Sequence, residues 1–224
     1  MIEASVLEAL GRYDSPTLSN AIETFDVRNR DDGYTGHEIR CMFPEMPPVV
    51  GLAATVGVRS HEPPINPLEP AVLWKHVQSI RGPRILVAQD LDDEGGVGAM
   101  WGEVQATIFK ALGCLAIATD GVVRDISEVR AMGLQLYARG TTASHAYAHF
   151  ESAGHTVTIG GLAIRPGDII HADQHGVLLV PPEIAARLPA AADKIIATEQ
   201  KLIRWIRSEE FDPAKLDEMR RVDH

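Results

Sequence analysis

The sequence contains very few cysteines, since Cys41 and Cys114 are the only two among 224 residues and lie far apart in the chain. A disulfide framework or a zinc cluster needs more cysteines at closer spacing, so we expect neither. Two isolated thiols fit a protein of the reducing cytoplasm. Aromatic residues make up only 5% of the chain. The core should therefore consist mainly of Ala, Val, Ile and Leu side chains, which suit close packing of helices on a sheet.

Long apolar runs are also missing, because no uninterrupted stretch approaches the roughly 18–20 residues that span a bilayer. Residues 1–14 contain two glutamates before the first basic residue, which indicates an amphipathic helix rather than a signal peptide. The formal net charge of −10 disfavours nucleic-acid binding, which depends on Lys and Arg. We therefore expect a soluble, cytoplasmic protein with neither a nucleic-acid nor a membrane partner. A site for an anionic ligand would need a local cation or a bound metal to reverse the field of the whole chain.

The middle of the chain alternates between strand-length apolar runs and helical patterns. This alternation, with glycine-containing loops between the elements, is typical of an α/β fold with parallel strands. We expect strands at 49–58, 84–89, 114–119 and 134–137, and helices at 70–80, 102–112 and 126–132.

The N-terminal segment has a helical pattern followed by a long polar stretch. A first helix is expected at 3–12, and a second one begins after Ser15, which we predict to be its N-cap before Pro16. The polar, proline-containing segment 27–48 should be a loop with one strand at about 39–43.

The C-terminal third changes from short strands to a long helix. Residues 155–164 indicate a hairpin that turns at two adjacent glycines, and two more short strands should follow the Pro-Gly turn at 166–167. An Ala-rich helix should cover 182–207, with a charged tail beyond it. Because the chain has no internal repeat and no clear linker, we predict that residues 1–224 form a single domain.

Two loops follow predicted parallel strands, at 90–103 and at 119–125. In an open α/β sheet, ligands bind beyond the carboxyl ends of such strands. The first loop ends at Gly102, where the absence of a side chain lets a ligand approach the backbone closely. The next helix starts there, and the unpaired N–H groups of Val104 and Gln105 in its first turn can hold a carboxylate with the help of the helix dipole.

The second loop ends in Arg124 and Asp125. Arg124 offers a forked cation for a carboxylate and a carbonyl oxygen. Asp125 and Glu103 are hard oxygen ligands of the kind that Mg²⁺ or Mn²⁺ accepts. Such a group suits retro-aldol cleavage or β-decarboxylation of a 2-oxo acid, because both reactions leave a pyruvate enolate whose oxygen needs stabilisation. The simpler interpretation of Arg124 and Asp125 is an ion pair that caps a helix at the surface.

The stretch from Trp101 to Val180 resembles the family of 4-hydroxy-4-methyl-2-oxoglutarate aldolases and the related regulator of ribonuclease E activity. The resemblance rests on the Gly102-Glu103 helix start, on ALGCLAIATDGVVRD and on IRPGDIIHADQHGVLLVP, with weaker matches at DSPTLSNAI and GLAATVGV. The aldolase pattern is an acidic residue, twenty intervening residues and then Arg-Asp. Glu103 and Arg124 are separated by the twenty residues 104–123, and Asp125 follows. The resemblance implies an α/β domain with a layered β/β/α, swivelling-domain-like core.

The resemblance also implies a role for each residue of the two loops. Arg124 binds the 2-oxo acid and polarises its carbonyl group, and Asp125 is the direct protein ligand of a magnesium ion, or of manganese. Glu103 contacts that metal through water, and the backbone amides of Val104 and Gln105 bind the pyruvyl carboxylate.

In this family a glutamate from the C-terminal helix of a neighbouring subunit also approaches the metal through water. Glu199 matches it best, and Asp193 is the alternative, because helices align loosely. A site shared in this way implies a homotrimer, or a hexamer of two trimers, with a small 2-oxo acid as the other partner.

Two departures from the aldolase pattern concern the substrate. Position 103 is glutamate where the family usually has aspartate, which is one methylene shorter. The segment 141–149 contains His145 and His149, four residues apart, which would share one face of a helix or one side of a strand. They are interpreted as substrate contacts, as a weak extra metal site or, preferably, as ordinary surface or interface histidines.

His171, Asp173 and His175 lie close together in the sequence and are all residues that bind metals. The resemblance places them at a tight turn between two strands, so we interpret the group as structural.

The first functional hypothesis is therefore a divalent-metal-dependent carbon–carbon lyase that releases pyruvate from a 4-hydroxy-2-oxo acid and also decarboxylates oxaloacetate. A lyase or hydratase that acts on another oxo acid is the alternative within the enzymes. A binding regulator of ribonuclease E is the alternative outside them, and Asp125 argues against it because those relatives lack the aspartate after the arginine. No methyl-donor glycine motif supports a menaquinone methyltransferase.

Overall fold

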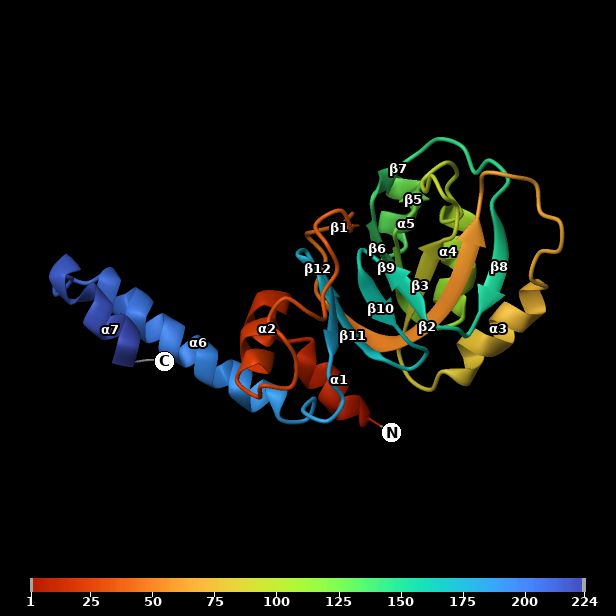
Figure 1. The fold of residues 1–224 in the computed structure, drawn as a ribbon. Coiled ribbons are helices and arrows are strands. Elements are labelled where there is room, and N and C mark those ends of the chain that lie inside the picture. The colour runs from red at the N-terminus through yellow and green to blue at the C-terminus, as the bar shows by residue number, and fades with distance from the viewer. Residues whose placement is uncertain (1, 223–224) are drawn as a thin grey trace.

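Apolar segments from the middle of the chain form the parallel centre of one eight-stranded sheet in the computed structural model, which describes residues 2–222 (Figure 1). The strands follow the spatial order β1-β6-β4-β3-β2-β11-β12, and β8 pairs with the far end of β2. Strands β2, β3, β4 and β6 are parallel to their neighbours in this group, as the alternation of apolar runs predicts. Their bounds are β1 Arg40–Cys41, β2 Val49–Arg59, β3 Arg84–Asp90, β4 Cys114–Thr119, β6 Gln135–Ala138, β8 His149–Ala153, β11 Ile169–Asp173 and β12 Gly176–Val180.

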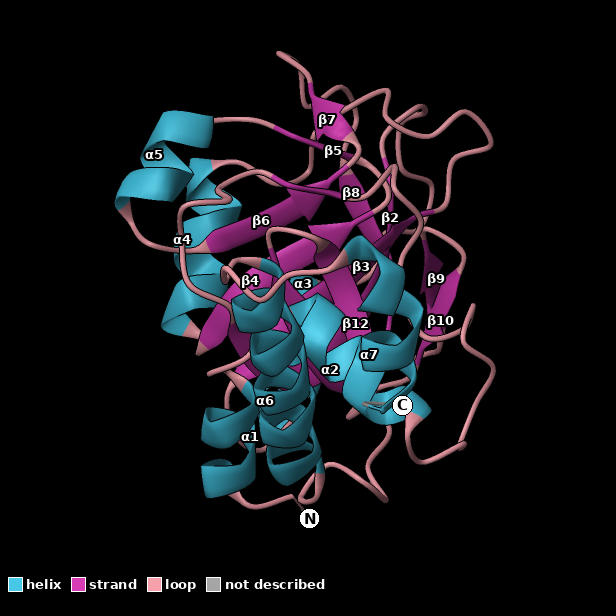
Figure 2. Ribbon diagram, turned by 90° about the vertical axis from the view of Figure 1, so that its left-hand side faces the viewer, coloured by secondary structure: helices cyan, strands magenta, loops and turns pink. Residues whose placement is uncertain are grey.

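Both faces of this sheet are covered, which explains why its strands are apolar at almost every position. Helices α3 (Pro70–Ser79), α4 (Glu103–Ala111) and α5 (Ile126–Ala131) pack on one face, and the hairpin of β9 (Val157–Ile159) and β10 (Leu162–Ile164) packs on the other. Figure 2 shows α4 and α5 on the opposite side of the sheet from β9 and β10. Alternate residues of each strand point to opposite faces, so Leu86 and Ile117 contact the helices while Ile85 and Val87 contact the hairpin. The predicted β/β/α layering is confirmed.

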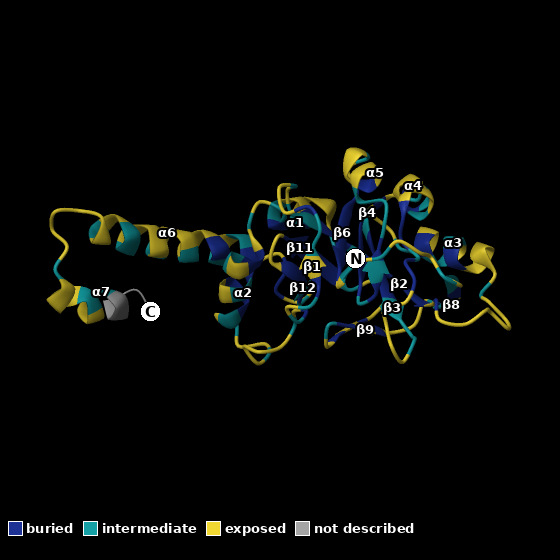
Figure 3. Ribbon diagram, turned by 90° about the horizontal axis from the view of Figure 1, so that it is seen from above, coloured by how far each residue is buried: buried dark blue, intermediate teal, exposed yellow. Residues whose placement is uncertain are grey.

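A third apolar cluster joins the two ends of the chain. Helices α1 (Ala4–Leu10) and α2 (Ser15–Glu23) and the first turns of α6 (Leu188–Ile206) pack on β11 and β12. The remainder of α6, the 3-10 turn Pro213–Lys215 and α7 (Leu216–Val222) project from the body as an arm whose described side chains are mostly exposed or half-buried (Figure 3). Within residues 2–222, no helix is both long enough and apolar enough to cross a membrane.

Three predicted element boundaries are wrong. The N-cap of α2 is Asp14, whose side chain accepts the N–H of Thr17 at 2.9 Å, and Ser15 is the first helical residue. The strand expected at about 39–43 is only Arg40–Cys41, and the helix expected from 182 begins at Leu188 because residues 183–187 form turns. The sequence also missed β5 (Val122–Val123), β7 (Gly140–Thr141) and β8, which are too short or too polar for a period-2 signal.

The predicted tight turn at His171, Asp173 and His175 is confirmed, since it joins β11 to β12. Its side chains also bind the segment that begins α2. Asp173 accepts the N–H of Ser15 at 2.7 Å and the N–H of His175 at 2.8 Å. His171 is fully buried, with Nδ1 3.0 Å from the hydroxyl of Ser15 and Nε2 2.9 Å from the carbonyl oxygen of Tyr13. These bonds hold the start of α2 against the β11–β12 hairpin.

Two carboxyl groups at the carboxyl edge of the sheet connect the ends of β3 and β4. The N–H of Asp90 donates to Asp120 Oδ1 at 2.7 Å, and Asp90 Oδ2 accepts the N–H of Gly96 at 2.7 Å. Burial, with a smaller contribution from Asp90, raises the pKa of Asp120 to about 6 from the ordinary 3.8. The pair therefore anchors the glycine-containing loop that leads from β3 to α4, at the cost of burying a carboxyl group.

Asp120→Asn should change how the free energy of unfolding depends on pH. Because the pKa of Asp120 is raised in the folded state, its contribution is fully present below about pH 4 and is lost as the pH rises through about 6. The neutral amide keeps the acceptor for Asp90 and does not titrate. From pH 4 to pH 7 the wild type should therefore lose on the order of 1 kcal/mol relative to the variant, after a discount for partial exposure. Urea unfolding of both proteins at the two pH values measures this difference, and parallel pH profiles would contradict it.

Candidate functional site

Three chain segments that are distant in sequence meet beyond the carboxyl ends of β3 and β4. Strand β5 pairs with β7 in parallel, and Trp101 forms an isolated bridge to Val123. The N–H of Arg124 donates to the carbonyl oxygen of Trp101 at 2.9 Å, and the N–H of Thr142 donates to that of Val123 at 3.1 Å. The backbone therefore places the start of α4, the Arg124-Asp125 pair and the segment after β7 side by side.

Gly102 lies directly against the Arg124-Asp125 pair. A Cβ atom at position 102 would be 2.4 Å from Asp125 Oδ2 and 2.9 Å from Arg124 Cγ, so any other residue there would displace these two side chains. Glycine at this position therefore leaves room for the two side chains, and the close approach of a ligand to its backbone stays a prediction. Asp125 Oδ2 accepts the N–H of Glu103 at 2.9 Å and lies 3.6 Å from Arg124 Nε.

The carboxylate of Asp125 does not cap its own helix. Asp125 occupies the N-cap position of α5, yet its side chain accepts no hydrogen bond from that helix. Its backbone has φ 52° and ψ 45°, a left-handed conformation that is uncommon for residues other than glycine. The carboxylate instead binds the first N–H of α4, twenty-two residues earlier in the sequence. The capping part of the simpler interpretation is therefore wrong, while its ion pair between Arg124 and Asp125 is present, and the strained backbone directs Asp125 towards α4.

The first turn of α4 presents unpaired donors, as predicted. The first intrahelical bond runs from the N–H of Ala106 to Gly102, so the N–H groups of Val104 and Gln105 have no acceptor among the described residues. Val104 is 70% exposed, so its side chain lies in solvent at the start of the helix. Gln105 Oε1 is buried and also has no hydrogen-bond partner in residues 2–222. An unpaired buried acceptor and two unpaired donors at the start of one helix can be satisfied by water or by a polar ligand.

A small cavity of about 160 Å³ opens at this point. It is well below the roughly 300–1,000 Å³ of pockets for drug-sized molecules, so it suits an acid of a few carbon atoms. Apart from Arg124 and His145, the lining residues carry no ionisable side chain. The residues that line it are Ala99, Met100, Gly102, Val104, Gln105, Arg124, His145 and Ala148.

The carboxylates beside the cavity fit a loosely coordinated divalent cation. Asp125 uses Oδ2 for Glu103 and Arg124, and Oδ1 has no partner within the described chain. Glu103 is exposed at the start of α4. No group of three or more His, Cys, Asp and Glu side chains in residues 2–222 could hold a metal ion. Magnesium usually keeps several waters and binds through one or two carboxylates, so Asp125 and Glu103 are a sufficient set for it but not for a fully protein-coordinated metal.

Glu199 lies outside this cavity in its own chain. It is exposed on α6, which extends away from α4 and α5, and it borders the surface near Asn20 and Thr24 of α2 (Figure 1). Asp193, the alternative, accepts a hydrogen bond from the hydroxyl of Tyr13 at 2.8 Å. Both carboxylates are exposed on α6, so the assignment of Glu199, with Asp193 as the alternative, stays a prediction.

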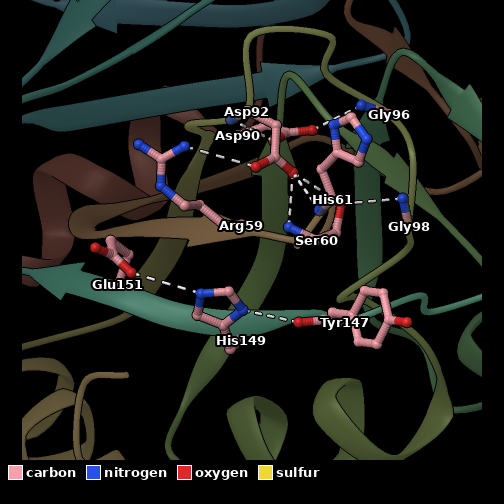
Figure 4. Close-up of polar contacts among 10 residues, drawn as sticks. All are labelled: Arg59, Ser60, His61, Asp90, Asp92, Gly96, Gly98, Tyr147, His149 and Glu151. Carbon is pink, nitrogen blue, oxygen red and sulfur yellow. Dashed lines mark hydrogen bonds and ion pairs between the residues drawn. The ribbon is translucent and has the colours of Figure 1, made fainter. Parts of the chain in front are cut away.

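The two histidines of segment 141–149 face different surroundings. Residues 142–148 form a loop and His149 begins β8, so the prediction of one shared helix face or strand side is wrong. His145 lines the Arg124 cavity. His149 lies between Glu151 Oε2, at 3.5 Å from Nε2, and the carbonyl oxygen of Tyr147, at 2.7 Å from Nδ1 (Figure 4). It borders a separate, larger cavity of about 470 Å³ with Arg59. Only the tertiary structure distinguishes the two rings.

Similar proteins of known sequence include enzymes by name. A protein of Halalkalibacterium halodurans named "Putative 4-hydroxy-4-methyl-2-oxoglutarate aldolase" is 32% identical over 135 residues. The match covers 59% of this chain and 60% of that relative, so the chain spans less than two thirds of the relative's length.

Solved structures of the same fold include proteins of other or unassigned roles. An uncharacterized protein from Pseudomonas syringae has a TM-score of 0.76 at 24% identity, with 99% of this chain and 95% of that chain covered. Streptomyces coelicolor RraAS2, described as an unusual member of the RNase ES inhibitor RraA protein family, has a TM-score of 0.69 at 23% identity, with 89% and 96% covered. At these identities the likeness concerns the fold.

The family assignment rests on most of the chain. Residues 15–179 match the family described as RraA-like, Aldolase/RraA, and this span includes the sheet, α4, α5 and every residue that lines the Arg124 cavity. The chain therefore belongs to the Aldolase/RraA family, whose members include proteins named as aldolases and proteins named as ribonuclease inhibitors.

Proposed function

We propose that this protein is a divalent-metal-dependent carbon–carbon lyase that cleaves a small 4-hydroxy-2-oxo acid to pyruvate and a carbonyl compound, and that it also decarboxylates oxaloacetate. The observation that carries the proposal is the position of the Asp125 carboxylate. It is drawn to the start of α4 beside Arg124 and two free N–H groups, with one oxygen left without a protein partner. The named relative from Halalkalibacterium halodurans supports the same class of reaction.

The polar groups of the cavity match the polar groups of a 2-oxo acid. The N–H groups of Val104 and Gln105 suit the carboxylate at C1, with the partial positive charge of the helix start behind them. The Arg124 guanidinium suits the oxygen at C2, where negative charge develops as the enolate forms. Gln105 Oε1 is an acceptor for a hydroxyl group of the ligand. The ligand is thus bound by its common pyruvyl half, while the other half extends out of the small cavity.

Asp125 and Glu103 would hold the divalent cation that this reaction class uses, and the cation would supply further stabilisation of the negative charge at the C1 and C2 oxygens. Asp125 Oδ2 remains bound to the N–H of Glu103, so the carboxylate is fixed before the cation arrives. Glu199 of another copy would add a third carboxylate to the set. Glu103 is longer than an aspartate, which moves its carboxylate outward from the helix start.

Asp125→Asn should abolish magnesium-dependent pyruvate release, because the amide keeps the shape and the hydrogen bond to Glu103 but removes the charge. Arg124→Lys should reduce kcat/KM by about 10²–10³-fold, because a single ammonium group cannot replace the planar fork at the developing enolate. A coupled assay of pyruvate release from oxaloacetate and from a panel of 4-hydroxy-2-oxo acids, with and without chelator, measures both effects. Asp31→Asn, on an exposed loop, is the matched control. Near-normal turnover by the Asp125 variant would overturn the metal site, and no turnover by the wild type would favour a binding regulator.

A site shared between copies should show complementation. Glu199→Gln and Asp125→Asn each remove one carboxylate from a different side of the proposed interface, so each variant alone should be inactive. Co-expressed with distinguishable tags, the two variants should form mixed trimers or hexamers in which some sites contain both wild-type residues and release pyruvate. Pyruvate release by the purified mixed oligomer, with sizing chromatography for its mass, is the measurement. A monomer, or a mixed oligomer without recovered activity, would contradict a shared site.

A further inference from the structure

His145 and Arg124 are the only titratable residues among the eight described residues that line the small cavity. Retro-aldol cleavage needs a group that takes the proton of the 4-hydroxyl. Arg124 remains protonated at any relevant pH and cannot do this. Gln105 contributes an amide, which neither gains nor loses a proton under these conditions. His145 is therefore the side chain of the cavity lining that can act as the base.

The turn that carries His145 is held firmly by its neighbours. The carbonyl oxygen of Ser144 accepts the N–H of Ala99 at 2.9 Å, and that of Ser60 accepts the N–H of Tyr147 at 3.0 Å. Within the turn, the N–H of Ala148 donates to the carbonyl oxygen of His145 at 2.9 Å. Ala146 has a φ of 46°, which is unfavourable for a residue with a side chain and persists only where the surroundings fix it.

A second layer of hydrogen bonds fixes Ser60 in turn. Asp92 Oδ2 accepts the N–H of Ser60 at 2.6 Å and the N–H of His61 at 2.9 Å, and the N–H of Gly98 donates to the Ser60 hydroxyl at 3.0 Å (Figure 4). A Cβ atom at Gly98 would be 2.5 Å from the carbonyl oxygen of His145, so the loop before α4 and the histidine turn are in direct contact. The same stretch, residues 98–102, therefore positions both the helix start and His145.

One ring nitrogen of His145 forms a hydrogen bond with a backbone carbonyl oxygen. Nδ1 lies 2.7 Å from the carbonyl oxygen of Ala146, and because a carbonyl oxygen only accepts, Nδ1 must carry the hydrogen. In the neutral ring Nε2 then has the free lone pair. A catalytic base held in one tautomer by a second-layer contact has this arrangement.

We propose that His145, through Nε2, is the general base for the 4-hydroxyl of the substrate, and that it makes the cavity selective for 4-hydroxy-2-oxo acids over acids that need only decarboxylation. This proposal rests on the proposed lyase function. Nothing in the family assignment by itself gives His145 a role.

In the proposed cleavage, His145 Nε2 takes the proton from the hydroxyl at C4. The O–H electron pair becomes the second bond of the new C4 carbonyl, and the C3–C4 bond breaks. Its electron pair forms the C2–C3 double bond of the pyruvate enolate, while the π pair of the C2 carbonyl moves onto its oxygen, which faces Arg124. The protonated ring then returns the proton to C3, which gives the methyl group of pyruvate and the neutral imidazole. Decarboxylation of oxaloacetate forms the same enolate by loss of CO₂ and has no hydroxyl proton to remove.

His145→Gln therefore should separate the two reactions. It should lower kcat for cleavage of a 4-hydroxy-2-oxo acid by about 10²–10⁴-fold, the usual contribution of a positioned base, while oxaloacetate decarboxylation changes less than about 10-fold. Added imidazole should restore part of the cleavage activity to His145→Ala, because the small ring can enter the space that the side chain vacates. His61→Gln is the matched control, since this exposed histidine borders the separate cavity near Arg59. Thermal unfolding of each variant checks that the fold is retained.

Each outcome bears on one proposal. Equal loss of both reactions in His145→Gln, with the fold intact, would show that the ring only shapes the cavity and would overturn the role as base. Unchanged cleavage would overturn it as well. If the wild type releases pyruvate from neither class of substrate, the lyase function fails, which is a different result from cleavage that does not depend on His145.

Discussion

The hydrogen bond from the N–H of Glu103 to Asp125 Oδ2 connects two helices that belong to successive βα units of the sheet. It forms only because Gly102 has no side chain and because the backbone of Asp125 is left-handed. The bond satisfies one of the orphan donors of α4, and the next two have no acceptor within residues 2–222. The position of Arg124, the exposure of Glu103 at the helix start and the shape of the cavity all depend on this contact.

The second constraint is the backbone pairing beyond the sheet. Strands of two residues each, β5 and β7, together with the Trp101–Val123 bridge, add little stability by themselves, because few residues are ordered by few bonds. Their role is positional, since they fix three loops against one another at the carboxyl edge of the parallel strands. Burial of Trp101 against Phe109 anchors this layer to the core, with the two rings 5.5 Å apart. Loops positioned by a rigid scaffold in this way commonly carry function.

Local charge at the site opposes the charge of the whole molecule. The chain has a formal net charge of −10, which repels a dianionic acid at long range. Arg124 and the start of α4 act at contact distance, where attraction exceeds the screened long-range field.

The sequence by itself determined the central sheet, its parallel pairing and the two loops where the site lies, because the apolar periods of buried strands and helices are local properties of the chain. It also determined that Gly102, Arg124 and Asp125 belong together, through the position of each at the end of a strand or the start of a helix. Only the tertiary structure decided which helix the Asp125 carboxylate binds, and that His145 faces the cavity while His149 faces another. These choices depend on hydrogen bonds between loops and two-residue strands that are distant in sequence, and such contacts leave no periodic pattern in the chain.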